Sequence, residues 1–274
     1  MITVAHALRE AAARLVKTSD TARLDAELLM AAALEVSRSE MLLKARDLTV
    51  PEEFAFMLER RLRHEPVAYI LERQEFFGRE FLVNANVLIP RADSETLIGV
   101  ALDRLMGAAR ILDLGTGSGA LLLTLLAERE QTEGVGLDAS LGAVAVAASN
   151  AATLGVSERA HILHGDWTVE GWRENLGRFD LVICNPPYVE SDAKLDPDVG
   201  KFEPASALFA GEDGLDDYKI LIPQLRALLH EDGCVVLEIG HEQADSVATI
   251  AHAAGFEAQL FRDLAHRPRA LLLT

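Results

Sequence analysis

The segment Asn185-Pro186-Pro187-Tyr188 contains the residue types that most directly suggest chemistry. It follows the apolar run 179–184, which predicts a buried strand ending at Asn185. The prolines fix φ and remove two backbone donors, so their carbonyls are free to accept from a ligand. The asparagine adds a side-chain oxygen and the tyrosine adds a flat ring. We therefore expect a site that grips a planar group carrying an NH2, although an ordinary strand-ending turn is the alternative.

A glycine-rich loop indicates where a ligand can approach the backbone. The apolar strand predicted over 110–114 contains Asp113 and leads into Gly115-Thr116-Gly117-Ser118-Gly119, followed by an apolar helical run. Glycines at this position allow a tight turn and a close approach of the backbone to a ligand. The spacing is neither Gly-x-Gly-x-x-Gly nor that of a phosphate-binding loop. We expect Asp113, Gly115, Thr116, Gly117 and Gly119 to form part of a cofactor site.

Two further carboxylates follow predicted strands. Asp138 ends the strand predicted over 134–138, where a carboxylate can accept from both ribose hydroxyls of an adenosine. Asp166 follows the strand predicted over 160–164 and could accept from an adenine amine, while Trp167 could cover the face of the ring. A solvated loop end is the alternative for any one of them. Three acidic residues at successive strand ends favour a nucleoside site.

These residues resemble the class I S-adenosylmethionine-dependent methyltransferases, and Asn-Pro-Pro-Tyr resembles the members that methylate amino or amide nitrogens. Other segments narrow the resemblance to the release factor glutamine methyltransferases: Ile89-Pro90-Arg91, Phe202-Glu203-Pro204, Gly211-Glu212-Asp213-Gly214-Leu215-Asp216, Leu237-Glu238-Ile239-Gly240 and Arg262-Asp263-Leu264-Ala265. Two segments depart from the expected pattern. Ala92-Asp93-Ser94-Glu95 replaces Pro-Glu-Thr-Glu, and His266-Arg267-Pro268 replaces Gly-Arg-Asp.

The resemblance covers essentially the whole chain and implies a reaction. A methyl group of S-adenosylmethionine would pass to the side-chain amide nitrogen (N5) of the glutamine in the Gly-Gly-Gln loop of class 1 peptide chain release factors, leaving S-adenosylhomocysteine. Asn185, Pro186 and Tyr188 would be catalytic, with Asn185 also touching the cofactor. Pro187 and Arg91 would help to bind the acceptor. In the expected pose, the Asn185 side-chain oxygen and the Pro186 backbone oxygen each accept one N–H, and Tyr188 packs against the amide plane.

The elements that must position these residues predict an α/β fold. We expect a doubly wound, mostly parallel seven-stranded sheet with a small all-helical N-terminal domain. Its strands are expected near 110–114, 134–138, 160–164, 179–184, 233–239, 256–261 and 269–273. The candidate site residues follow the first four of these strands, and such sheets bind ligands beyond the carboxyl ends of their strands.

The chain divides into three predicted parts. Residues 1–72 are expected to form a helical bundle for substrate recognition, with Pro66 ending its last helix; a purely stabilising bundle is the alternative. Residues 73–92 predict a β-hairpin linker, and residues 93–274 predict the S-adenosylmethionine-dependent methyltransferase domain.

Charge and cysteine usage limit the classes of partner. The net charge is −17, with 11 basic and 13 acidic residues in 1–75 and 15 basic and 30 acidic in 76–274. This balance disfavours a stable nucleic-acid complex and suits a protein with a basic surface. Cys184 and Cys234 lie in apolar runs and are expected to be buried thiols, and no metal-ligand spacing is present. With no signal peptide and no long apolar stretch, we expect a cytoplasmic monomer without membrane contact.

Three other functions remain open from the residues alone. An adenine-N6 methyltransferase acting on DNA or RNA would use the same tetrapeptide on a flipped-out base, but it should carry a basic groove. A glutamine methyltransferase could act on another translation protein. A binding module that kept the fold without the chemistry is the third, and the intact glycine loop, Asp138 and Asn185–Tyr188 argue against it.

Overall fold

The computed structural model describes residues 3–274, which fold into two compact units. The helical unit comprises the chain through Arg73 together with the segment Leu195–Phe202. The sheet unit comprises Gln74–Lys194 and Glu203–Thr274. Across the described residues, no helix is both long and apolar enough to cross a membrane.

The helical unit buries one apolar stripe from each of its main helices. Its helices are α1 (Val4–Leu15), α2 (Ala22–Ala33), α3 (Arg38–Lys44), α4 (Glu52–Leu62), α5 (Val67–Leu71) and α9 (Pro197–Phe202). The side chains at helical spacing, such as Leu8 and Leu15 on α1 and Leu29 on α2, form one core. The expected helical bundle is therefore present in this unit.

The ends of these helices test the sequence signals. The capping-box spacing of Ser37 and Glu40 predicts a helix start there, and the structure confirms it: Ser37 Oγ accepts from the Glu40 backbone N–H at 3.1 Å at the start of α3. The same spacing at Thr49 and Glu52 predicts a helix that starts after Thr49, and this prediction is wrong: α4 begins at Glu52, Pro51 precedes it, and no side chain caps it. The expectation for Pro66 was wrong. α4 already ends at Leu62, and Pro66 instead precedes α5, where a missing N–H costs nothing.

A buried ion pair holds the helical unit together and captures a distant segment. The Arg61 Nε–Asp25 Oδ2 distance is 2.6 Å, and both side chains are buried. The other side of the Arg61 guanidinium lies 3.7 Å from Asp198 Oδ2 on α9. Because the two carboxylates share one cation, α9 joins the helical unit although it follows the fourth strand of the sheet in the chain.

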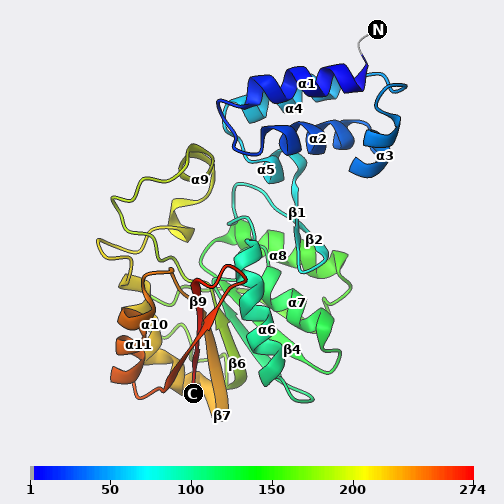
Figure 1. Ribbon diagram of the computed structural model, residues 1–274. Coiled ribbons are helices and arrows are strands. Elements are labelled where there is room, and N and C mark those ends of the chain that lie inside the picture. The colour runs from blue at the N-terminus through cyan, green and yellow to red at the C-terminus, as the bar shows by residue number, and fades with distance from the viewer. Residues whose placement is uncertain (1–2) are drawn as a thin grey trace. The chain divides into compact units, whose positions relative to one another are not determined.

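The sheet unit contains the predicted seven-stranded sheet. Within the described residues the strand order is β5-β4-β3-β6-β7-β9-β8, and only β9 runs antiparallel to its neighbours (Figure 1). The strands are β3 (Arg110–Leu114), β4 (Glu133–Asp138), β5 (Ala160–His164), β6 (Phe179–Cys184), β7 (Leu229–Glu238), β8 (Ala258–Arg262) and β9 (Pro268–Leu273). All seven lie within a few residues of their predicted positions, so the expected fold class is confirmed.

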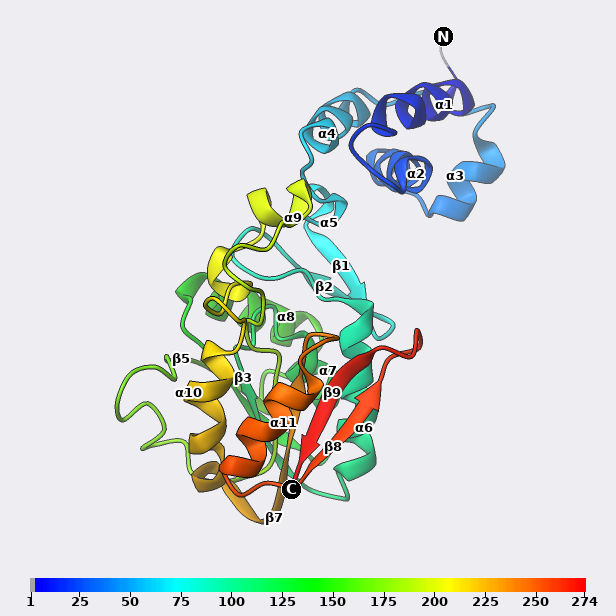
Figure 2. The same ribbon diagram turned by 60° about the vertical axis from the view of Figure 1, so that its left-hand side comes forward.

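Helices cover both faces of this sheet. α6 (Glu95–Arg104), α7 (Ala120–Glu128) and α8 (Leu141–Thr153) pack on one face, and α10 (Asp216–Leu225) and α11 (Ala244–Ala253) on the other (Figures 1 and 2). Three short 3₁₀ turns complete the unit: η1 (Ala92–Ser94), η2 (Ala205–Ala207) and η3 (Arg226–Leu228). Cys184 and Cys234 are buried free thiols in the two cores, as expected.

The strand order creates a switch point beside the central strand. The chain runs outward from β3 to β4 and β5, then returns to β6 on the other side of β3. The loops that follow β3 and β6 therefore diverge and leave a crevice between them, which is where open α/β sheets bind ligands. The glycine loop follows β3 and the Asn-Pro-Pro-Tyr segment follows β6.

A hairpin precedes the sheet and is fastened to it by one buried amide. β1 (Arg73–Phe76) and β2 (Arg79–Leu82) are joined at Phe77 and Gly78, which have φ of 50° and 71°, as a tight hairpin requires. Asn150 of α8 accepts from the Leu82 N–H at 2.7 Å and donates to the Leu82 carbonyl at 3.0 Å. It also donates to the Ser118 carbonyl at 2.8 Å, which links the hairpin to the glycine loop.

We expect Asn150→Ala to destabilise the sheet unit by about 1–3 kcal/mol or more, since buried polar groups lose their partners. Both tryptophans, Trp167 and Trp172, lie in that unit, so their fluorescence during urea unfolding reports it. The neighbouring exposed Ser149→Ala should change stability by less than about 0.5 kcal/mol. Equal midpoints for the two variants would contradict the role given to Asn150.

Candidate active site

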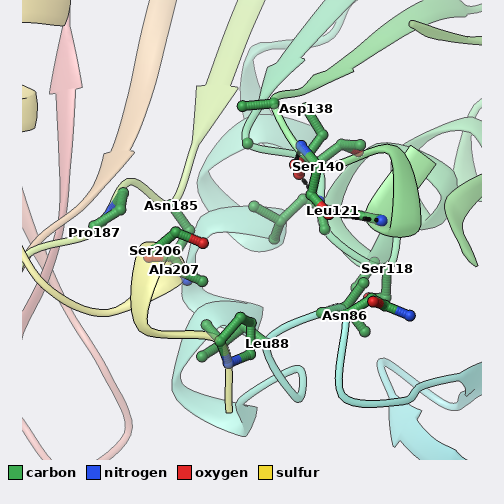
Figure 3. Close-up of a pocket in the computed structure, with 18 of the residues that line it drawn as sticks. Asn86, Leu88, Ser118, Leu121, Asp138, Ser140, Asn185, Pro187, Ser206 and Ala207 are labelled. Carbon is green, nitrogen blue, oxygen red and sulfur yellow. Dashed lines mark hydrogen bonds between the residues drawn. The ribbon is translucent and has the colours of Figure 1, made fainter. Parts of the chain in front are cut away.

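A pocket of about 460 Å³ opens at the carboxyl ends of β3, β4 and β6. Figure 3 shows Asp138 and Ser140 on one side of it and Asn185 and Pro187 on the other. Leu88 and Ala207 also line the pocket. The volume falls within the range of roughly 300–1,000 Å³ that small-molecule sites occupy. Residues from three strand ends therefore meet at one site, as the sequence predicted.

The glycine loop and Asp138 form one wall of this pocket. Gly115 and Gly117 have φ of 72° and 55°, which residues with a side chain rarely adopt. Asp138 accepts from the Gly117 N–H and from the Ser140 N–H, both at 2.8 Å. Each carboxylate oxygen keeps a further lone pair, so Asp138 can still accept from a ligand diol.

Asp113 and Gly119 lie behind the loop and outside the pocket wall. Asp113 is buried and accepts from Thr116 Oγ1 at 2.6 Å, while its second oxygen has no partner among the described residues. Burial raises the pKa of Asp113 to about 7, and the Thr116 hydrogen bond opposes that shift. Gly119 has φ of 81°, and a Cβ built there would lie 2.6 Å from Leu123. Both residues shape the loop, whereas Thr116 itself lines the pocket.

Trp167 and two carboxylates define a second wall. Trp167 lies against Gly115, where an added Cβ would lie 3.2 Å from the indole. Its Nε1 donates to Asp217 Oδ1 at 2.9 Å, which fixes the ring at the pocket edge. Asp166 lines the pocket and accepts from Thr168. Burial raises the pKa of Asp217. The pocket is thus rich in hydrogen-bond acceptors and unsuited to a polyphosphate.

Residues 185–188, which we term the proline turn, form the opposite side. Asn185 and Pro187 line the pocket, and Pro186 between them in the chain is buried. Among residues 3–274, no group hydrogen-bonds to the Asn185 side-chain amide, so its oxygen is available to a ligand. The structure thus brings Asn185 and Pro187 to the same pocket as the glycine loop and Asp138.

Tyr188 points away from this pocket. Its hydroxyl donates to Glu238 Oε1 at 3.2 Å, and its ring packs against the core shared with α10 and α11. Burial and the nearby Glu238 carboxylate raise the pKa of Tyr188. In this structure its side chain therefore secures the proline turn from behind.

Arg91 lies on the pocket wall and is already engaged. Its guanidinium lies 2.5 Å from Glu203 Oε1, and Glu203 also accepts from the Ile89 N–H at 3.1 Å. Glu203 is buried, so this pair ties the segment before η1 to the segment that leads into η2. Both segments line the pocket, at Pro90 and Pro204. The geometry shows Arg91 bridging two walls.

Comparisons with known proteins agree with this geometry. Residues 6–71 match the family described as PrmC N-terminal domain, and residues 93–202 match the Methyltransferase small domain. The release factor glutamine methyltransferase of Caulobacter vibrioides is 40% identical over 263 residues, spanning 92% of this chain and 89% of that protein. The enzyme of the same description from Rhodospirillum rubrum is 41% identical over 257 residues, spanning 91% and 78%. The chain belongs to the release factor glutamine methyltransferase family.

Solved structures support the fold at lower identity. The crystal structure of a methyltransferase from Pyrococcus furiosus superposes with a TM-score of 0.51 and 15% identity, covering 72% of this chain and 89% of that one. At this identity the likeness shows the fold alone.

The departures from the family pattern preserve the hydrogen-bonding chemistry. Ser94 donates to Glu238 Oε2 at 2.5 Å, so serine keeps the hydroxyl of the expected threonine. Asp93, in place of glutamate, accepts from Arg269 at 2.9 Å. Glu95 accepts from the Phe77 N–H at 2.9 Å. The shortened and substituted side chains in this family member therefore still find polar partners.

Several pocket residues were not identified from the sequence. Asp217, Ser140 and Asn86 line the pocket but belong to segments with no recognised ligand motif. A signal existed for Asp217, because it directly follows the Gly211–Asp216 segment. Asn86 could not be found this way, because it reaches the pocket only through the hairpin. Its side chain packs against Gly142, because a Cβ built on Gly142 would lie 2.6 Å from Asn86 Cγ.

The pocket residues fit S-adenosylmethionine. Asp138 offers acceptors for a ribose diol, Asp166 and Asp217 offer acceptors for amines, and Trp167 offers a flat apolar face. Carboxylates also suit a cationic ligand, whereas Arg91, already neutralised by Glu203, offers little to a phosphate. When bound, this group supplies an electrophilic methyl on a sulfonium.

We expect Asp138→Ala to weaken binding of S-adenosylmethionine by about 1–3 kcal/mol, because ligand hydroxyls and the Gly117 N–H lose their acceptor. Isothermal titration calorimetry measures the change. Glu133→Ala removes a carboxylate from the other end of the same strand, where it is exposed, and should leave the affinity unchanged. An unaltered dissociation constant for Asp138→Ala would remove this residue from the site.

Proposed function

We propose that this protein transfers a methyl group from S-adenosylmethionine to the N5 amide nitrogen of the glutamine in the Gly-Gly-Gln loop of a class 1 peptide chain release factor. The observation that carries the proposal is the placement of the Asn185 amide, to which no described residue hydrogen-bonds, in the pocket that also contains the glycine loop and Asp138. Membership of the release factor glutamine methyltransferase family supports the choice of acceptor.

The residues of the proline turn hold the acceptor. The Asn185 side-chain oxygen and the Pro186 backbone oxygen each accept one N–H of the glutamine amide, which aims the nitrogen into the pocket. An amide nitrogen is a weak nucleophile, so alignment matters more than a strong base. Near-attack positioning can be worth roughly 7–11 kcal/mol. The two oxygens also stabilise the positive charge that develops on nitrogen.

The same arrangement rejects glutamate. A carboxylate has no N–H to give, so the Asn185 and Pro186 oxygens would lose their partners and face a negative charge. The acidic residues at the pocket, Asp138, Asp166 and Asp217, add repulsion. Selectivity for an amide over an acid thus follows from the acceptor groups themselves.

Recognition of the intact release factor is assigned to the helical unit. Its core is complete, yet Phe56 is 73% exposed and Leu43 is 84% exposed. Exposed apolar side chains of this size suit a protein partner. A second contact surface raises the effective concentration of the acceptor loop at the pocket without adding chemistry.

Asn185→Ala should lower kcat/KM for methylation of a purified release factor by roughly a hundredfold or more, because the nitrogen loses its alignment. Cofactor affinity should stay nearly constant in calorimetry. Exposed Asn175→Ala serves as the matched control and should be as active as the unmodified protein.

Radiolabelled methyl transfer should be compared on three acceptors: the release factor, its Gly-Gly-Glu variant and adenine-containing oligonucleotides. Incorporation into the release factor alone is expected. Near-normal turnover of Asn185→Ala, or preferential labelling of nucleic acid, would overturn the proposed function.

The helical unit is tested by Phe56→Ser combined with Leu43→Ser. We expect KM to rise at least about fivefold for the intact release factor and to stay unchanged for a short Gly-Gly-Gln peptide, because only the protein reaches a second surface. Met106→Ser is the control, since Met106 is 86% exposed but precedes β3, away from the carboxyl edge. Unchanged KM on both acceptors would leave these two side chains without a recognition role.

A further inference from the structure

A buried polar cluster lies behind the proline turn, and the proposed reaction does not use it directly. The cluster consists of Ser94, Tyr188, Glu238, Asp263 and Arg269, which come from five segments of the sheet unit. Glu238 is at its centre, at the carboxyl end of β7 and only 1% exposed. β9, which carries Arg269, pairs with β7 (Figure 1).

The two carboxylate oxygens of Glu238 accept hydrogen bonds from two different segments. Oε2 accepts from Ser94 Oγ at 2.5 Å, and Ser94 lines the pocket. Oε1 accepts from the Tyr188 hydroxyl at 3.2 Å and lies 3.9 Å from Arg269 Nη1. One buried carboxylate therefore connects the proline turn to the pocket wall at η1.

If the cluster served only the stability of the fold, it would be a costly way to fill this volume. Asp263 Oδ2 and Arg269 Nε are buried without a hydrogen-bond partner among the described residues. Arg269 Nη2 donates to Asp93 Oδ2 at 2.9 Å, but within the cluster Arg269 lies 3.9 Å from Glu238 Oε1 and 3.6 Å from Asp263 Oδ2. Partly satisfied buried charges are usually less stabilising than apolar packing of the same volume. Proteins most often depart from the rule that buried polar groups are fully hydrogen-bonded at their functional sites.

The backbone of Tyr188 is held as closely as its side chain. Its N–H donates to the Leu208 carbonyl at 3.2 Å, and its carbonyl accepts from Gln243 Nε2 at 3.0 Å. A Cβ built on Gly214 would lie 2.4 Å from that carbonyl oxygen, so glycine is required for this approach. With the backbone and the hydroxyl all engaged, Tyr188 fixes the end of the turn that presents Asn185 and Pro186.

We propose that Glu238 is a positioning residue for methyl transfer: by holding the Tyr188 hydroxyl and Ser94 together, it sets the geometry of the proline turn relative to the pocket wall. It touches neither cofactor nor acceptor. The effect of Glu238 on methyl transfer rests on the proposed function, whereas its effect on the geometry of the proline turn does not.

The test compares Tyr188→Phe, Glu238→Gln and the double variant in the full chain. Tyr218→Phe is the matched control, because its buried hydroxyl donates at 2.8 Å to the Glu238 backbone oxygen and not to the carboxylate. Each single cluster variant should lower kcat on the release factor by roughly tenfold, the scale of a hydrogen bond to a charged group. KM and the cofactor dissociation constant should stay within about twofold. Adding Tyr188→Phe to Glu238→Gln should cost less than about twofold more, because the two residues act as one unit.

A second measurement is independent of activity. Hydrogen exchange at the Tyr188 and Val189 amides should accelerate about tenfold in Glu238→Gln and remain unchanged in Tyr218→Phe. Unaltered exchange in Glu238→Gln, or an equal loss of kcat in Tyr218→Phe at matched folding, would overturn the positioning role. If the unmodified protein failed to methylate a release factor while exchange behaved as stated, the proposed function would fall and the positioning of the turn would stand.

Discussion

The pairing of β3 with β6 is the contact on which the candidate site depends. In the chain, 70 positions separate the end of β3 from the end of β6, at Leu114 and Cys184, yet these two residues are direct partners in the parallel register. Because parallel strands present their carboxyl ends at one edge, the pairing brings the glycine loop and the proline turn to the same crevice. The reaction needs cofactor and acceptor amide a few ångströms apart, and this one register provides that proximity.

Around this crevice, the chain uses carboxylates where many nucleotide sites use cations. Asp138 accepts a hydrogen bond from the Gly117 N–H and also lines the pocket. A single side chain therefore shapes the loop and offers acceptors to a ligand diol. Asp217 fixes Trp167 through the indole N–H. The only arginine on the pocket wall, Arg91, is paired with Glu203 within the described residues. The resulting field suits a cationic ligand and a neutral amide, and it disfavours phosphate and carboxylate groups.

The pocket is supported by polar groups that lie outside it. Asn150 fastens the hairpin to the glycine loop, Glu203 joins two wall segments, and Glu238 joins the proline turn to η1. Each of these side chains is buried and hydrogen-bonds to at least one segment far from it in the chain. Such groups cost desolvation, but they hold loops that lack regular secondary structure to a fixed geometry, which a site dependent on alignment requires.

The sequence by itself determined the architecture and which candidate residues follow its strands. Alternating apolar runs and helical stripes predicted all seven strands, because a doubly covered parallel sheet needs continuous buried segments. Strand ends then identified Asp138, Asp166 and Asn185, since short-range order along the chain fixes which residues follow a strand. The same local logic failed at Pro66, where a helix start and a helix end have the same proline signal.

Only the tertiary structure decided what depends on long-range packing. The orientation of Tyr188 toward Glu238, the capture of α9 by Arg61 and Asp25, and the arrival of Asn86 at the pocket all join segments far apart in the chain. No local pattern encodes such contacts, because a side chain's rotamer and partners follow from the packing of every element around it. The residue types that can do the chemistry are therefore readable in the sequence, while the network that positions them is a property of the fold.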